Sequence, residues 1–245
     1  MRGRLLGLAF AVLAGAPMIA AEMSGPQAEE ALVLIDTARR CRAEKLNARS
    51  EALYRRAIAK IEAAAGPGTM DLIPALNGLA ELYFDEQRYT ESEALSLRSA
   101  ALVEANLGDA HPLLATALQN LAAIYHVEEQ YDKAGPLYLR ALRIRERSLG
   151  PDHPFVAATL ANLAALEGAQ GNYGLAAEHY GRALKIQQAY FGEHDPQVAQ
   201  TLAAYAAVLR KTCHKREAAA VEARRRAALR AASFDSADRG APAAR

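Results

Sequence analysis

Apolar residues recur along this chain at steps of three and four, which predicts amphipathic helices. Val156, Leu160 and Leu163 fall on one helical face, and a second apolar face runs from about residue 175 to residue 190. Gly171-Asn172 interrupts the pattern between the two stretches, as expected for a turn. The pattern therefore predicts a helical hairpin.

The hairpin pattern repeats with a period of 42 residues. Glycine can end a helix with a positive φ, and proline suits the first turn of a helix, where its missing N–H costs no hydrogen bond. Positions that keep their residue type at this spacing are Gly66, Gly108, Gly150 and Gly192; Pro112, Pro154 and Pro196; Leu76, Leu118, Leu160 and Leu202; and Arg56, Arg98, Arg140 and Arg182. The period predicts stacked copies of one hairpin.

Short polar side chains precede the repeated prolines, where a helix needs a cap for its first N–H groups. Asp152 or His153 can cap one helix, and Asp195 stands at the same place in the last repeat. His111 has the register position of His153. Equivalent residues are two helices apart, at about 8 to 10 Å per packing step, so we expect capping and no shared metal ion.

The segment LGPDHPFVAATLANLAALEGAQGNYGLAAEHYGRALKI, from Leu149 to Ile186, and its counterpart from Leu107 to Ile144 resemble the tetratricopeptide repeat. They are most similar to the longer variety found in kinesin light chains. The resemblance implies an all-α fold, a right-handed superhelical solenoid of about five antiparallel helix pairs. We expect the solenoid over residues 22–232. Well-matched repeats lie at 66–108, 109–150 and 151–192, degenerate pairs at 28–65 and 193–232, and a disordered tail at 233–245.

The N-terminus has the pattern of a secretory signal. Arg2 and Arg4 precede an uncharged apolar run that ends in small residues near Ala20 and Ala21. We therefore expect residues 1–21 to be a signal peptide and the protein to be exported, either periplasmic or secreted. The alternative is an uncleaved segment that anchors the protein in the membrane.

Composition fits a helical protein without a strongly charged partner. The chain is 51% hydrophobic and only 6% aromatic, lacks tryptophan and has a formal net charge of +1. Binding to nucleic acid or to an anionic membrane needs a net basic surface, so we expect neither kind of partner. No nucleotide-binding, metalloprotease or hydrolase motif occurs, and we predict no enzyme activity, no cofactor, no metal site and no catalytic residue.

The two cysteines belong to opposite ends of the predicted solenoid. Cys41 stands one period before Tyr83 and should be buried. Cys213 falls between the helices of the last pair and should be exposed. An intermolecular disulfide and an idle thiol are then the two alternatives for this residue. An internal bridge would need Cα atoms within about 7 Å, which this separation excludes.

The resemblance implies a binding groove along the first helix of each pair, where an asparagine before a Leu-Ala pair contacts the backbone of a bound peptide. Asn120 and Asn162 match, Asn77 lies one residue early, and Ala204 replaces the asparagine in the last repeat. The candidate groove residues are Asn77, Glu81, Asp85, Gln119, Asn120, His126, Asn162, Arg210 and Lys211. The alternative is that the asparagines are packing residues bonded to neighbouring helices.

Charge along these positions changes from acidic to basic. This predicts an extended peptide with a basic end near Asp85 and an acidic end or carboxylate near Arg210. The basic run from Arg210 to Arg226 is then either a solvated capping helix or a docking patch for an acidic partner.

The sequence thus predicts a non-catalytic scaffold or adaptor for protein–protein interaction in an exported compartment. It would bind a protein or an extended peptide on the concave face. Alternatives are a structural subunit of an envelope complex that self-associates through its terminal repeats or Cys213, and a small-molecule binder or enzyme.

Overall fold

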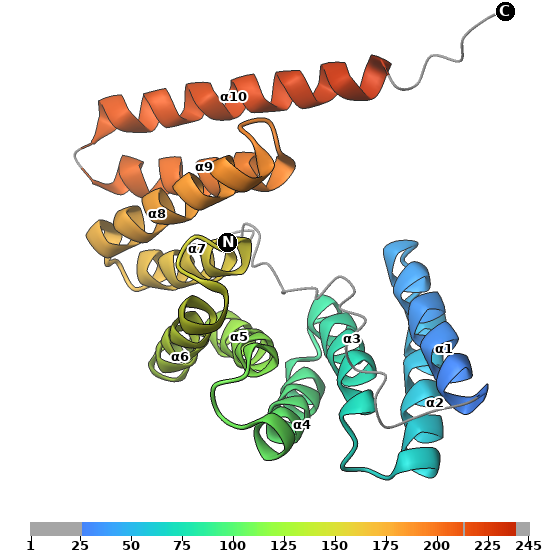
Figure 1. The fold of residues 1–245 in the computed structure, drawn as a ribbon. Helices are drawn as coiled ribbons and strands as arrows, with labels where there is room; N and C mark the ends of the chain where they lie inside the picture. Colours follow the sequence, from blue (N-terminus) through green and yellow to red (C-terminus); the bar gives the residue numbers. More distant parts are fainter. Residues whose placement is uncertain (1–25, 213, 239–245) are drawn as a thin grey trace, which may run out of the picture. The chain divides into compact units, whose positions relative to one another are not determined.

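The computed structural model describes residues 26–212 and 214–238, with side chains up to residue 230. Within this part of the chain the fold has ten α-helices, one short 3-10 helix and no strand (Figure 1). The elements are α1 (Pro26–Ala43), α2 (Asn47–Ala65), η1 (Met70–Leu72), α3 (Ile73–Asp85), α4 (Tyr89–Leu107), α5 (Pro112–Val127), α6 (Tyr131–Leu149), α7 (Pro154–Ala169), α8 (Tyr173–Phe191), α9 (Pro196–Lys211) and α10 (Lys215–Asp238). The segment expected to be a signal peptide and Cys213 lie outside the described residues.

The ten helices follow one another as five successive hairpins in the chain, which confirms the all-α repeat solenoid predicted from the 42-residue period. The two helices of a hairpin contact each other in the pairs α1–α2, α3–α4, α7–α8 and α9–α10. The first pair, α1 and α2, and the last, α9 and α10, are the sequences in which the repeat is degenerate. Cys41 is buried in α1, as its register predicted.

The helix ends are built by the residues that the period singled out. Gly66, Gly108, Gly150 and Gly192 follow the second helices with φ between +81° and +88°. His153 caps α7, because its Nδ1 accepts the Phe155 N–H at 3.2 Å, and Asp195 caps α9 by accepting the Gln197 N–H at 2.7 Å. His111 does the same for α5. The predicted capping roles are confirmed.

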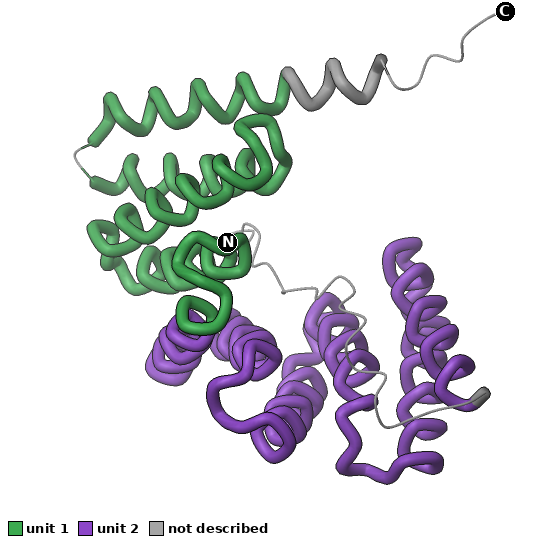
Figure 2. Tube along the Cα trace, in the orientation of Figure 1, with its two compact units in different colours: residues 1–9, 145–245 green, residues 10–144 purple. Residues whose placement is uncertain are grey.

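The chain divides into two compact units between Ile144 and Arg145, inside α6 (Figure 2). In the unit with α1 to α5, the core contains Tyr54, Leu72, Leu76, Val103 and Leu114. In the unit with α7 to α10, Leu184, Val198, Leu202, Leu209 and Val221 form one cluster, and Ala164, Ala176, Tyr180 and Val208 form a second. Each unit therefore has an apolar interior of its own.

The last helix is longer than the sequence pattern suggested. α10 continues to Asp238, so residues 233–238 are helical where a disordered tail was expected from residue 233. Alanine and arginine dominate this helix and both favour helix, so it continues although the periodic apolar pattern has ended. The remainder of the expected tail, residues 239–245, is outside the described chain.

Candidate peptide-binding face

The first helices of successive pairs lie next to one another within each unit. α3 contacts both α1 and α5 in one unit, and α7 contacts α9 in the other. We call these two surfaces the first-helix faces. All of the predicted groove residues belong to these helices, six to α3 and α5, and Asn162, Arg210 and Lys211 to α7 and α9. Five of them are buried: Glu81, Gln119, Asn120, His126 and Asn162.

Asn120 on α5 has an unsatisfied amide. The residue is 1% exposed, and neither Oδ1 nor Nδ2 has a hydrogen-bond partner among the described residues. Asn77 on α3 likewise has a buried Oδ1 without a partner in this part of the chain. A buried polar group without a partner costs about 1 to 3 kcal/mol. These amides are therefore groups that an added hydrogen-bond partner would stabilise.

In the α3 repeat the position of the asparagine holds a glycine, and a side chain there would meet a tyrosine ring. Gly78 occupies it, and a Cβ placed there would lie 2.5 Å from the ring of Tyr54 on α2. One period later Ser96 stands in place of Tyr54 and Asn120 in place of Gly78. A further period along, Tyr138 occurs together with Asn162, so the size of the second-helix residue alone does not decide which residue stands here. The Ser96 hydroxyl, like the Asn120 amide, lacks a partner among the described residues.

Asn162 and Gln119 are also buried, at 2% and 0% exposed. This burial favours packing between helices, because contact with a bound backbone requires neighbouring side chains to move and expose the amides. Asn77, Gln119 and Asn120 thus belong to first helices of one unit, and Asn162 belongs to a first helix of the other.

The predicted acidic end of the groove is neutralised within the protein. Arg42 of α1 forms an ion pair with Glu81 and a second one, at 2.9 Å, with Asp85. Burial raises the pKa of the Glu81 carboxyl, and Arg42 opposes this shift. The carboxylates expected to receive the basic end of a peptide are therefore already engaged by a residue of the degenerate first pair.

His126 is buried beside an aromatic ring. Its side chain lies edge-on to Tyr131 with ring centroids 5.9 Å apart, which matches the Phe84–Tyr89 pair one period earlier at 5.6 Å. Burial lowers the pKa of His126 to about 4, so its imidazole is neutral near pH 7. The residue acts as an aromatic packing group as well as a candidate contact.

Arg210 and Lys211 form the basic end of the α7–α9 face. Both are exposed in the last turn of α9, and neither has an ion pair among the described residues. Glu167 of α7 is already engaged, because its carboxylate lies 2.8 Å from Nδ1 of His179 on α8. The available charge of this face is therefore positive.

Sequence reasoning missed Arg42, although the register could have identified it. Arg42 stands one period before Phe84 and two before His126, in the same column of first-helix residues. The weak repeat pattern of the first pair hid this correspondence.

Among residues 26–212 and 214–238, no group of three or more His, Cys, Asp or Glu side chains is arranged to hold a metal ion. None of the described helices is long and apolar enough to span a bilayer.

The fold and its first-helix faces define an all-α repeat solenoid of the kind that presents side chains to other proteins. The tetratricopeptide repeat model matches residues 71–128, 119–189 and 160–231, so the chain belongs to the tetratricopeptide repeat family. No curated protein matches the chain.

Solved structures share this fold. BtubC (BKLC) from P. vanneervenii is 23% identical, with a TM-score of 0.68 over 89% of this chain and 94% of that protein. A kinesin light chain-like protein of Podosopora anserina with nearly identical TPR-like repeats is 18% identical, with a TM-score of 0.71 over 86% of this chain and 100% of its own. The apo form of RapI is 19% identical, with a TM-score of 0.66 over 81% of this chain and 69% of its own. At these identities the likeness establishes the fold alone.

Proposed function

We propose that this protein is a non-catalytic scaffold or adaptor that binds an extended segment of a partner protein on its first-helix faces. The observation that carries the proposal is the amide of Asn120, whose donor and acceptor both lack partners among the described residues. Because the residue is buried, side chains around it have to move before a partner backbone reaches the amide. A peptide backbone offers an N–H and a C=O together, which is the complement of a side-chain amide.

The partner segment is expected to be acidic where it meets α9. Arg210 and Lys211 are exposed and without ion pairs among the described residues, whereas Glu81 and Asp85 are engaged by Arg42. The proposal therefore keeps the acidic end predicted from the sequence and drops the basic end.

The compartment belongs to the same proposal. The basic start and apolar run of residues 1–21 support export to the periplasm or the outside of the cell. N-terminal sequencing of the protein purified from its native compartment tests this: a start near residue 21 or 22 supports export, and an intact Met1 counts against cleavage.

Peptide capture tests the binding face. A library of extended peptides is screened against the full mature chain, and binders are re-measured with Asn120→Ala, Asn162→Ala and Arg210→Ala. Loss of one amide contact should weaken binding about tenfold. Asn172→Ala is the matched control, because Asn172 is exposed and its side chain does not cap α8.

The control should bind like the parent chain, and helical content should be unchanged in all variants. Equal affinities for the parent and the Asn120→Ala variant would remove the proposed role of this face. End-to-end self-assembly, the competing function, would appear as a mass that rises with concentration in light scattering.

A further inference from the structure

Ion pairs between the second helices of neighbouring hairpins form a ladder that follows the 42-residue period. In each rung an arginine meets the glutamate 36 residues before it. The rungs are Arg98–Glu62 at 2.5 Å, Arg140–Glu104 at 2.7 Å and Arg182–Glu146 at 2.7 Å. We call this set the arginine–glutamate ladder.

The next rung lacks its acid. Arg224 of α10 has the arginine position, but Gln188 of α8 stands where the glutamate would be. The carboxylate nearest to Arg224 in the ion pairs of the described residues is that of Glu193, at 3.9 Å, and the two side chains are 50% and 71% exposed. Such an exposed and distant pair contributes little, so Arg224 keeps most of its capacity to bind an anion.

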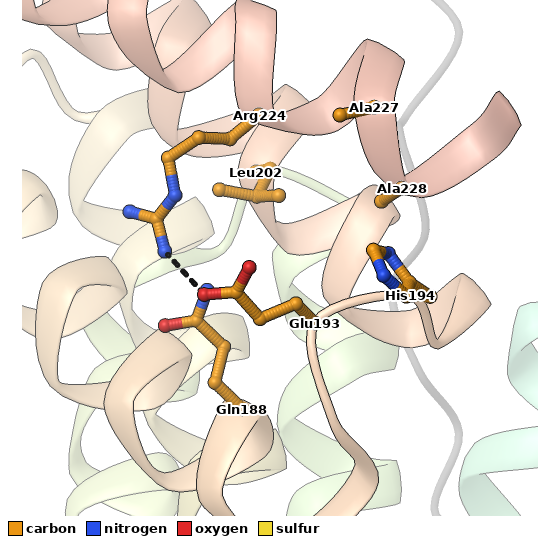
Figure 3. Close-up of a pocket in the computed structure, with 7 residues that line it drawn as sticks. All are labelled: Gln188, Glu193, His194, Leu202, Arg224, Ala227 and Ala228. Atoms are coloured by element: carbon orange, nitrogen blue, oxygen red, sulfur yellow. Dashed lines mark ion pairs between the residues drawn. The ribbon is translucent and has the colours of Figure 1, made fainter. Parts of the chain in front are cut away.

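A small pocket of about 70 Å³ lies beside this incomplete rung (Figure 3). Its apolar part comes from Leu202, Ala227 and Ala228, and Gln188, Glu193, His194 and Arg224 provide the polar part. Figure 3 shows the Arg224 side chain extending from α10 toward Gln188 and Glu193. A hollow with an apolar wall and a guanidinium suits a short side chain that ends in a carboxylate.

We propose that this pocket binds a glutamate or aspartate side chain of a partner protein and that the bound carboxylate completes the ladder. The Arg224 guanidinium donates to the carboxylate as the arginines of the other rungs do, and the Gln188 amide donates a further N–H. The methylene groups of the ligand pack against Leu202 and Ala228. Glu193, the acid that faces the pocket, competes with the ligand for Arg224.

The site goes beyond the proposed function because α8, α10, the loop before α9 and Leu202 of α9 line it, and none of the predicted groove residues does. Binding here is independent of Asn120, Asn162 and Arg210. Failure of one site in the experiments therefore leaves the other untouched.

The test is an NMR titration of the full mature chain with a blocked Gly-Ser-Glu-Ser-Gly peptide. We expect saturating shifts at Gln188, Arg224 and Ala228. The same peptide with glutamine in place of glutamate should bind at least about tenfold more weakly, since it lacks the negative charge. Free glutarate forms a second arm, and shifts with glutarate but none with the peptide would overturn the proposal of a protein partner.

Three variants give a signature that a non-specific charge effect would not reproduce. Gln188→Glu supplies the missing acid within the chain and should abolish binding, and Arg224→Gln should do the same. Glu193→Gln removes the competing carboxylate and should tighten binding about two- to fivefold. Arg140→Gln, on a completed rung, is the control and should change nothing. Equal binding by the Gln188→Glu variant and the parent chain would contradict the site.

Discussion

Four residues at the turn between the helices of a pair adopt a left-handed backbone. Lys45, Gln87, Glu129 and Gly171 have φ of 60°, 62°, 61° and 84° and are spaced by the 42-residue period. In each turn the following residue donates its N–H to a carbonyl of the preceding helix, such as Asn172 N–H to Glu167 O at 2.8 Å. This is a Schellman ending, in which glycine avoids a Cβ penalty of about 1 to 2 kcal/mol.

Gly171 and Glu129 therefore offer opposite substitutions at equivalent positions. Gly171→Ala should lower the free energy of unfolding by about 1 kcal/mol, although nothing lies within 4 Å of the added Cβ, and Glu129→Gly should raise it by a similar or smaller amount. Urea unfolding measures both. Gly174→Ala, which adds a methyl group to a glycine inside α8, is the control and should be neutral or stabilising. Destabilisation by Gly174→Ala equal to that by Gly171→Ala would contradict the backbone explanation.

His126 makes the stability of the fold depend on pH. Its pKa is lowered to about 4 by burial, whereas an unfolded histidine titrates near pH 6.5. The unfolded chain therefore binds more protons between these values, and the contribution of His126 is present above pH 6.5 and lost as the pH falls toward 4. The loss between about pH 7.5 and about pH 5 should reach about 2 kcal/mol.

Phe84 supplies the matched substitution for this prediction. It occupies the same register position and makes the same edge-on contact with a tyrosine, so His126→Phe should keep the packing and remove the titrating group. Urea unfolding of both chains at about pH 7.5 and about pH 5 gives the comparison. A drop in stability that is the same in the variant as in the parent would assign the pH dependence to other residues.

At the scale of elements, the contact between one pair and the next changes from apolar to polar along the chain. In the repeat register, Ile61 corresponds to a position opposite Ala75, and Val103 to the same position opposite Ala117. In the next two repeats these apolar pairs become Arg145 with Thr159 and Gln187 with Thr201. Arg145 is 1% exposed, and it donates to the Thr159 hydroxyl at 2.5 Å and the Phe155 carbonyl at 3.1 Å. Burial lowers the pKa of this guanidinium to about 10, which shows the cost of its desolvation.

Replacing this polar pair with the residues found one period earlier should restore an apolar contact between α6 and α7. Thr159→Ala alone removes a hydrogen bond to a buried charge and should cost about 1 to 3 kcal/mol. The double variant Arg145→Val with Thr159→Ala should be at least as stable as the parent, because well-packed apolar groups often equal or exceed buried charged ones. A double-mutant cycle by urea unfolding measures the coupling, and additive losses would contradict it.

The sequence predicted the elements well because their ends depend on local chemistry. The period placed Gly150 after one helix, His153 as the cap of the next and Gly171 in the turn, and the structure has each of them there. The right-handed superhelix stays a prediction. The extension of α10 to Asp238 was missed because alanine and arginine favour helix without creating an apolar period.

The candidate site was harder to predict because its state depends on long side chains that reach between elements. The register placed Glu81 and Asp85 on a first helix, but it did not reveal that Arg42 of α1 pairs with both. It also gave no sign that the Asn120 amide would be buried without a partner among the described residues. The helix that carries each candidate residue was predictable, whereas the ion-pair and hydrogen-bond partners of its side chain were not.

At the scale of the whole molecule, the two end faces carry charges at register positions that are apolar between α8 and α9. Between α8 and α9, Tyr180 packs with Ala204 and Val208. The residue one period after Tyr180 is Glu222, which pairs with Arg225 at 2.6 Å, and those equivalent to Ala204 and Val208 on α1 are Asp36 and Arg40, which pair at 2.5 Å. A further copy stacked at either end would have to desolvate these charges, so the ends act as polar caps.

Exchanging the cap residues for internal ones should convert the protein into a head-to-tail polymer. On α10 the variant has Glu222→Tyr, Arg225→Ala and Arg226→Leu, which copies Tyr180, Ala183 and Leu184 of α8. On α1 it has Asp36→Ala and Arg40→Val, which copies Ala204 and Val208 of α9. Light scattering should then give a mass that rises with concentration, since two complementary and different faces generate an open assembly. The α10 changes alone leave the charged α1 face in place and should give no such rise. A fully exchanged chain that folds with unchanged helical content but keeps a constant monomer mass would show that the charges are not what ends the stack.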